Sequence, residues 1–133
     1  MSRDLIEALI SGAPYASQLG IRLVETEPDR AVLEMPFKES LVTIADIVHG
    51  GAISSLIDTA ATAAAWSVTE LPENPRGTTV ALTVNFVAAA KGVDLTASAR
   101  VIRRGRSLCY CDIEVVTPAG DLVAKGLVTY KLG

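Results

Sequence analysis

The stretch GGAISSLIDTAATAAAWSV, residues 50–68, decides the fold of this chain. Its apolar side chains recur at the i, i+3, i+4 and i+7 spacing, which predicts one long helix with a buried face. The buried stripe consists of Ile53, Leu56, Ile57, Ala60, Ala61 and Ala64. A proline-rich turn over residues 71–77 ends the helix. Asp58 in its middle would cost about 2.5–3.5 kcal/mol inside a bilayer, so we expect the helix to pack on a sheet and not to span a membrane.

Runs of alternating apolar and polar residues lie on both sides of this helix and predict strands. Two runs precede it and four follow it, separated by turns rich in glycine, proline and aspartate. The predicted strands cover residues 21–27, 31–37, 78–88, 94–103, 107–116 and 122–132. Residues 2–10 are predicted to form a short outer helix, stopped by Gly12 and Pro14. This order predicts an α+β fold in which one long central helix packs on an antiparallel sheet of about six strands.

The composition fits a single domain, residues 1–133, that buries much apolar surface. Half of the residues are hydrophobic and only 20% are charged, so we expect subunit contacts to cover part of the surface. A net charge of −3 and the lack of a basic run argue against nucleic acid as a partner. Residues 1–10 lack the basic start and continuous apolar core of a secretory signal, so a cytoplasmic location is expected.

Two cysteines, Cys109 and Cys111, fall on one face of a predicted strand. Their C-x-C spacing suits a structural disulfide poorly. A zinc site would lack ligands, because the chain has no further cysteine and a single histidine. We therefore interpret both as buried structural thiols and expect no metal site.

Asp58 is the only charged residue within residues 50–68. A helical wheel places it about 140° from Ile53, on a side that it shares with Thr62 and, more loosely, Trp66. A surface helix would carry Lys and Glu on that side, so we expect this second face to be covered as well. A carboxylate in a covered, weakly polar place either hydrogen-bonds at an interface or takes part in chemistry.

The start of the same helix favours chemistry. His49-Gly50-Gly51 offers free backbone N–H groups at the positive end of the helix dipole, and its two glycines let a substrate carbonyl approach closely. Eight residues of helix separate Gly50 from Asp58 by about 12 Å, which is too far for both to act on one carbonyl. Two copies packed antiparallel across a two-fold axis would bring Gly50 of one toward Asp58 of the other. Composition and chemistry thus predict the same dimer.

His49, Gly50, Gly51 and Asp58 resemble the pattern of the hotdog-fold thioesterases of the phenylacetate-degradation type, whose helix opens with H-G-G and carries Asp nine residues after the His. The resemblance covers nearly the whole chain, including residues 19–21, 79–86 and 105–107 and the closing strand. It implies a hotdog fold and the hydrolysis of an acyl-CoA. The Gly50 N–H would polarise the thioester carbonyl, and Asp58 of the partner subunit would be the nucleophile or the base for water. A homodimer, and further a dimer of dimers, is expected.

The same resemblance assigns supporting roles to neighbouring residues. Thr62 sits where relatives place a hydroxyl that supports the carboxylate or water, and Thr79 matches a Ser or Thr of the following strand. Both are alternatively small interface residues. Gly51 is expected beside the substrate. His49, the only histidine, is interpreted as a structural residue that caps or orients the helix start, with direct catalysis as the alternative.

Two positions depart from the family pattern. Relatives carry Asn six residues before the His and Gly three before it, where this chain has Thr43 and Asp46. The replaced Asn alters the polar surroundings of the thioester, and Asp46 is a candidate either for a substrate contact or for structuring its loop. Downstream, Arg103, Arg104 and Arg106 cluster at a strand turn, where they would meet either a CoA phosphate or only solvent.

Three functions are compatible with these residues. The leading hypothesis is an acyl-CoA thioesterase that needs no cofactor beyond the CoA of its substrate. The alternative is a non-catalytic acyl-CoA-binding hotdog protein, which the departures at Thr43 and Asp46 favour and which would bind acyl-CoA without releasing CoA. A hydratase or dehydratase is disfavoured, because those enzymes place a His and a carboxylate at other spacings. The identity of the acyl group does not follow from the sequence.

Overall fold

A computed structural model describes residues 3–133. In chain order its elements are α1 (Arg3–Ser11), α2 (Pro14–Leu19), β1 (Arg22–Glu27), β2 (Arg30–Met35), the short 3-10 helix η1 (Glu39–Leu41), β3 (Val42–Ile44), β4 (Ile47–Val48), α3 (Gly50–Trp66), β5 (Gly77–Phe86), β6 (Leu95–Arg104), β7 (Leu108–Val116) and β8 (Leu122–Leu132). Ser2, where the sequence predicted the first helix to begin, lies outside the described residues.

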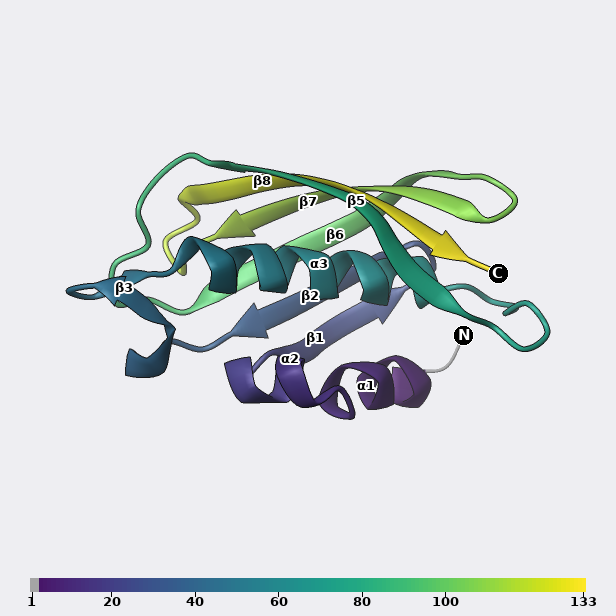
Figure 1. The fold of residues 1–133 in the computed structure, drawn as a ribbon, viewed down its shortest axis with the longest axis horizontal. Coiled ribbons are helices and arrows are strands. Elements are labelled where there is room, and N and C mark those ends of the chain that lie inside the picture. The colour runs from purple at the N-terminus through teal and green to yellow at the C-terminus, as the bar shows by residue number, and fades with distance from the viewer. Residues whose placement is uncertain (1–2) are drawn as a thin grey trace.

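Six strands form one antiparallel sheet in the order β1-β2-β6-β7-β8-β5, and α3 lies across one face of it (Figure 1). The helix α1 packs on β1, and both α1 and α2 contact α3. The predicted α+β architecture, with one long helix on a sheet of six antiparallel strands, is therefore confirmed. None of the described helices is long and apolar enough to cross a membrane.

The core lies between α3 and the sheet, as the apolar stripe predicts. Leu56, Ile57 and Ala60 are fully buried there. Alanines let the helix approach the strands closely, and at Gly126 of β8 there is no room for a side chain, because a Cβ would lie 2.6 Å from Cγ2 of Ile57. A glycine in the middle of β8 is thus required by the helix that crosses it.

The two cysteines lie side by side on the helix-facing side of β7. Cys109 and Cys111 are each 1% exposed and are free thiols. Burial raises the pKa of the Cys111 thiol to about 12 and also raises the pKa of Cys109. Both are the buried thiols that the sequence predicted, and neither is activated as a nucleophile.

Two parts of the fold differ from the prediction. The first helix ends at Ser11, before Gly12 and Pro14, as predicted, but the prediction lacked α2, which Pro14 opens at its first turn, where the missing N–H of proline costs nothing. The segment between β2 and α3, which the sequence left without structure, contains η1 and the small hairpin β3–β4. Strands of two and three residues are too short to show an alternating pattern.

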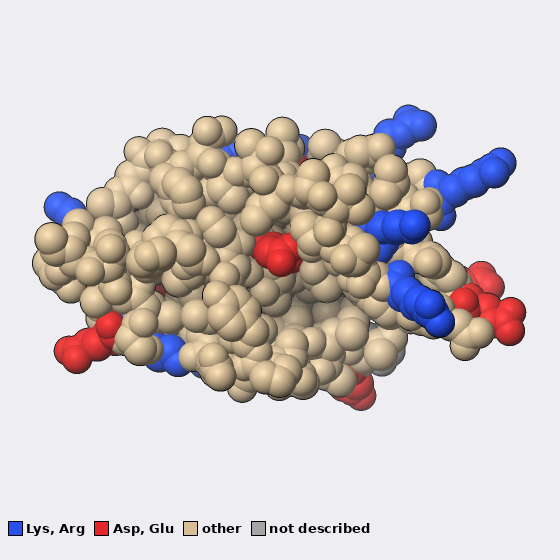
Figure 2. All heavy atoms as spheres, viewed as in Figure 1, with Lys and Arg blue, Asp and Glu red and all other residues tan. Residues whose placement is uncertain are grey.

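The edge strand β5 is left largely uncovered. It pairs only with β8, so one side of its backbone has no partner strand among the described residues. Val80 and Phe86 are more than half exposed and Leu82 is 41% exposed. Figure 2 shows that the face carrying α3 and β5 has almost no charged side chains over most of its area. An apolar edge strand of ten residues is a surface that pairs readily with another strand.

Candidate functional site

Asp58 stands in the middle of α3, on the side that faces β5. Its Oδ1 accepts a hydrogen bond of 2.6 Å from the hydroxyl of Thr79, and the residue is partly buried. The hydroxyl fixes the direction of the carboxylate and satisfies one of its oxygens. The structure therefore brings together Asp58 and Thr79, two of the residues that the sequence selected.

An irregularity in β5 aims Thr79 at the helix. Thr79 pairs with Tyr130 and Ala81 pairs with Thr129, so Val80 is an extra residue in the ladder. This bulge places Thr79 on the same face as Leu82, although strict alternation would put them on opposite faces.

Thr62 lies one turn after Asp58, but its hydroxyl does not contact the carboxylate. It donates instead to the backbone oxygen of Asp58 at 3.0 Å, and it hydrogen-bonds with the hydroxyl of Tyr130. Trp66 donates its Nε1 proton to the same tyrosine oxygen at 2.8 Å. Thr62 thus belongs to a small polar network under β5, next to the carboxylate.

Tyr130 is the centre of this network and was missed by the sequence analysis. Burial raises its pKa, against the opposing effect of the hydrogen bonds from Trp66 and Thr62, so the phenol stays neutral. Gly77 passes directly over the ring, because a Cβ at that position would lie 2.0 Å from the tyrosine oxygen. A tyrosine among the buried apolar residues of β8 was the available signal, since a buried tyrosine hydroxyl usually has a partner.

The start of α3 offers a free donor. His49 is the N-cap: its Nδ1 accepts the N–H of Gly51 at 2.7 Å, which places the ring proton on Nε2. The N–H of Gly50 has no partner within residues 3–133. The ring of Phe86 lies 3.3 Å from where a Cβ of Gly50 would be. Gly50 therefore presents its N–H beside an aromatic wall, at the positive end of the helix.

A hollow of about 400 Å³, called here the Gly50 hollow, opens at this helix start. It is lined by Thr43, Ile47, Val48, Gly50, Ile53, Phe86 and residues 87–90. Thr43 and Gly50 thus line the same hollow. Asp46 points elsewhere: its backbone oxygen accepts the N–H of Gly92 at 2.9 Å, and its carboxylate lies against the same glycine. Asp46 structures the loop.

A second hollow, of about 180 Å³, lies between the N-terminal helices and α3 and is called the α1–α3 hollow. Its lining residues are Leu9, Ile10, Ala13, Tyr15, Ala16, Asp58, Thr59, Thr62 and Ala63. Asp58 is the only charged residue in this lining. Gly50 and Asp58 thus open into two different hollows, separated by about 12 Å of helix rise.

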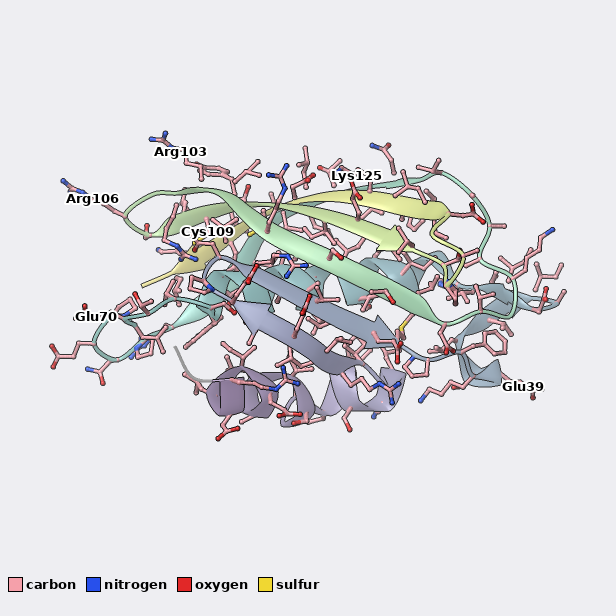
Figure 3. The ribbon with its side chains drawn as sticks, turned by 180° about the vertical axis from the view of Figure 1, so that it is seen from behind. Glu39, Glu70, Arg103, Arg106, Cys109 and Lys125 are labelled. Carbon is pink, nitrogen blue, oxygen red and sulfur yellow. The ribbon has the colours of Figure 1, made fainter. Side chains whose placement is uncertain are left out.

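The three arginines of the β6–β7 turn, Arg103, Arg104 and Arg106, have different surroundings in the structure. Arg104 is bound to Asp29 at 2.8 Å and donates to the backbone oxygen of Ala65 at 3.1 Å. This guanidinium joins the end of β6 to the β1–β2 turn and the end of α3. Arg103 and Arg106 project outward from the β6–β7 turn (Figure 3). Arg103 and Arg106 are exposed, whereas Arg104 is partly buried.

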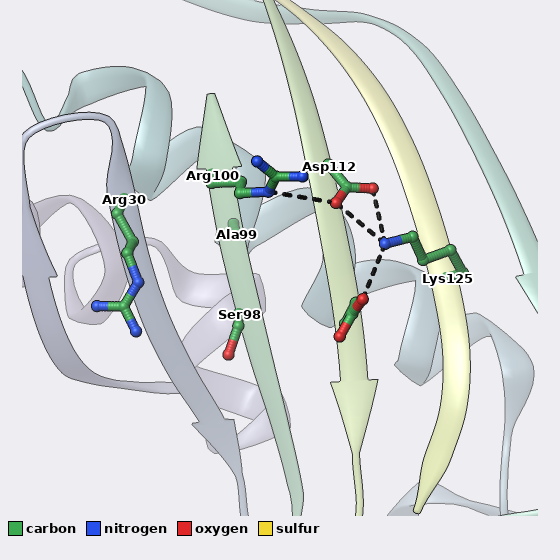
Figure 4. Close-up of a pocket in the computed structure, with 7 residues that line it drawn as sticks. Arg30, Ser98, Ala99, Arg100, Asp112 and Lys125 are labelled. Atoms are coloured by element: carbon green, nitrogen blue, oxygen red, sulfur yellow. Dashed lines mark hydrogen bonds and ion pairs between the residues drawn. The ribbon is translucent and has the colours of Figure 1, made fainter. Parts of the chain in front are cut away.

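A further hollow on the opposite face of the sheet is filled with paired charges. It is lined by Arg30, Ser98, Ala99, Arg100, Asp112, Glu114 and Lys125 (Figure 4). Lys125 binds Asp112 at 2.9 Å and Glu114 at 3.0 Å, and these ion pairs raise its pKa. Because its carboxylates are bound by cations, this hollow lacks a group free for chemistry. Within residues 3–133, no three His, Cys, Asp or Glu side chains form a group able to hold a metal.

Comparison with known proteins assigns this arrangement to a class. The model of the thioesterase superfamily matches residues 45–124, which include α3 and most of the sheet. Acyl-coenzyme A thioesterase 13 of Homo sapiens is 28% identical over 98% of this chain and 94% of its own length. A putative esterase of Saccharolobus solfataricus is 31% identical over 98% of this chain and 85% of its own length.

A solved structure agrees with these sequence matches. The PaaI protein of the phenylacetic acid degradation operon of E. coli superimposes with a TM-score of 0.83 at 28% identity, covering 93% of this chain and 87% of that one. The fold is that of a hotdog thioesterase, as the sequence predicted. The chain belongs to the thioesterase superfamily, and it is a hydrolase that cleaves thioesters.

Proposed function

We propose that this protein hydrolyses acyl-CoA thioesters to the free acid and CoA, with Asp58 as the reacting carboxylate. The observation that carries the proposal is the hydrogen bond from Thr79 to Oδ1 of Asp58, which holds the one charged side chain of α3 in place. Asp58 is also the one charged residue among those that line the α1–α3 hollow. Acyl-coenzyme A thioesterase 13, which matches nearly the full chain, supports the choice of acyl-CoA as substrate.

Two routes use this carboxylate. In the first, Oδ2 attacks the thioester carbon, the C–S bond breaks, CoA leaves as the thiolate, and water then hydrolyses the mixed anhydride. In the second, Asp58 takes a proton from a water molecule, whose oxygen forms the new bond to the thioester carbon; the C–S bond then breaks and CoA leaves as the thiolate. Both routes need an oxygen of Asp58 that Thr79 does not occupy, and the single hydrogen bond at Oδ1 leaves Oδ2 for that task.

The developing negative charge on the carbonyl oxygen needs a donor. The free N–H of Gly50, at the positive end of α3, has the chemistry of an oxyanion hole. Within one chain it opens into a hollow different from that of Asp58. We therefore assign each site to two subunits, with Gly50 from one and Asp58 from the other.

The uncovered strand β5 supports such a dimer. Antiparallel pairing of two β5 strands across a two-fold axis would continue the sheet and cover Val80, Leu82 and Phe86. The same axis would set the two α3 helices antiparallel, so that the start of one helix faces the middle of the other. Pairing of two such dimers into a tetramer is a further part of the proposal.

The residues that bind the CoA part of the substrate are inferred from their charge. Arg103 and Arg106 extend from the β6–β7 turn and are suited to phosphate groups of CoA, whereas Arg104 is held by Asp29. The proposed reaction uses no separate cofactor, because CoA is part of the substrate. Thr43 lines the Gly50 hollow where relatives carry Asn, and Gly51 is committed to the cap of His49.

A non-catalytic acyl-CoA-binding protein is the second candidate, because Thr43, in the lining of the Gly50 hollow, offers one hydroxyl where an amide is usual. One experiment separates the two functions. Release of free thiol is followed with aryl and aliphatic acyl-CoAs for the wild type and Asp58→Asn. Turnover that the variant loses supports the thioesterase. Saturable binding of acyl-CoA with no thiol release from any substrate would establish the binding protein instead.

A further inference from the structure

The α1–α3 hollow combines a reactive group with an apolar enclosure. Leu9 and Ile10 of α1 form one wall, and Ala63 of α3 contributes to the opposite wall. Asp58 is part of the same lining. The hollow opens on the weakly charged face seen in Figure 2. An apolar pocket with one charged group matches the general form of a small-molecule site, and that group is here the proposed reacting carboxylate.

Two residues of the N-terminal segment limit the size of this hollow. Tyr15, 61% exposed, stands at its rim and is held over α3 by a hydrogen bond of 3.1 Å between its hydroxyl and that of Ser55. Ala13 presents only a methyl group toward the interior, and it has extended backbone angles that any residue can adopt. A larger side chain at position 13 would fill space, and a smaller one at position 15 would open it.

We infer that the α1–α3 hollow is the acyl-binding pocket, and that Ala13 and Tyr15 determine which acyl groups fit. This rests on the proposed function. An apolar cavity of roughly 150 Å³ holds one benzene ring, and the hollow measures about 180 Å³. It therefore takes a compact apolar acyl group of the size of one ring or a chain of about six carbons, with its carbonyl carbon at Asp58. Longer chains meet Tyr15.

The other hollows fit this group less well. The Gly50 hollow lies at the far end of the helix from Asp58, and the hollow on the outer sheet face contains Lys125 with its two carboxylate partners. Burying an acyl chain in the latter would remove those charged groups from water, which is costly. Of the three hollows described above, the α1–α3 hollow is the one that combines apolar walls with Asp58.

The test compares kcat/KM for acetyl-, hexanoyl- and decanoyl-CoA. The variants are Ala13→Leu, which fills the pocket, Tyr15→Ala, which opens it, and Ala8→Leu, the same enlargement on the exposed side of α1 outside the hollow. We expect Ala13→Leu to lower the hexanoyl-to-acetyl ratio by about tenfold or more, because a few methylenes in an apolar pocket carry that much discrimination. Tyr15→Ala raises the decanoyl-to-hexanoyl ratio, and Ala8→Leu changes neither ratio.

Equal losses on all three substrates in Ala13→Leu, or unchanged ratios, would overturn the assignment of the pocket while leaving hydrolysis established. Melting curves identify a misfolded variant, in which case Ala13→Val takes its place.

A binding measurement separates this inference from the proposed function. Hexanoyl-CoA and acetyl-CoA are titrated calorimetrically into Asp58→Asn with and without Ala13→Leu. If the wild type releases no CoA, a selective loss of hexanoyl-CoA affinity still supports the pocket, and an unchanged or absent preference refutes it.

Discussion

The hydroxyl of Thr79 in β5 donates to the carboxylate of Asp58 in α3 at 2.6 Å. This bond joins the edge strand to the helix at the place where the bulge at Val80 turns the strand. It ties the direction of the proposed reacting group to the strand that we expect to form the dimer. A change in either β5 or α3 at this place is therefore expected to alter the catalytic rate.

Replacing Thr79 by Val tests this bond with almost no change of volume. We expect Thr79→Val to lower kcat by about tenfold or more, because a hydrogen bond to a charged group contributes roughly 1.5–3 kcal/mol. Thr79→Ser, which keeps the hydroxyl, should retain most of the rate. The measurement is steady-state thiol release for the two variants and wild type. Equal rates in Thr79→Val and Thr79→Ser would show that the hydroxyl has no part in the reaction.

Gly50→Pro removes the proposed oxyanion donor. Proline is favourable at the first helical position, and His49 before it already has extended backbone angles (φ −62°, ψ 135°) that suit a residue preceding proline. We expect kcat to fall about 10²–10³-fold, the usual loss for one oxyanion donor. Gly50→Ala is the matched control, since it also adds a Cβ against Phe86 but keeps the N–H. Comparable losses in both variants would assign the effect to crowding.

Mixing two inactive variants tests the shared site. A dimer of one Asp58→Asn chain and one Gly50→Pro chain would contain one intact site, with Gly50 from the first chain and Asp58 from the second. Random exchange of subunits should then restore about a quarter of the wild-type rate, because half of the dimers are mixed and each has one of two sites. The rate is measured after co-refolding or co-expression. No recovery, although mass spectrometry detects mixed dimers, would place each site within one chain.

Local pattern was enough to predict α3 and the six strands, because helical and strand periodicities are properties of neighbouring residues. It also selected Asp58, the one charge in an apolar helix, and His49, whose position before two glycines suggested a cap. The contact between Asp58 and Thr79 was not derivable from alternation, since it depends on one extra residue at Val80 in a ladder formed with β8.

The other differences between prediction and structure come from contacts between residues that are far apart in the sequence. Arg104 was grouped with Arg103 and Arg106 by proximity in sequence, yet its partner Asp29 lies at the β1–β2 turn, and only the folded sheet brings the two together. Tyr130 acquires its role from Gly77 and the end of α3, which lie far from it along the chain. Such contacts follow from strand order, which the sequence did not specify.

This division of the arginine cluster predicts different effects for its members. Arg104→Ala should lower the melting temperature and leave KM for acyl-CoA near the wild-type value, because its guanidinium joins Asp29 to the end of α3. The double variant Arg103→Ala/Arg106→Ala should raise KM, more at low salt than at high salt, with little change in melting temperature. Thermal unfolding and kinetics at two ionic strengths measure both. A raised KM with unchanged stability in Arg104→Ala would reverse the assignment.

The buried thiols predict how the protein responds to alkali. Burial raises the pKa of Cys111 to about 12, whereas the ordinary value is 9.0. Between these two values the unfolded chain loses the proton and the native chain keeps it, so the free energy of unfolding falls as the pH rises above about 9.

At pH 8 the neutral thiols of Cys109 and Cys111 should react with Ellman's reagent only as fast as the protein opens. Two thiols should titrate at once in guanidinium chloride. Cys111→Ala should reduce the alkaline loss of stability, followed by denaturant unfolding at pH 8 and pH 10. Rapid modification of native protein at pH 8, or an alkaline slope unchanged in Cys111→Ala, would contradict this account of the strand β7 core.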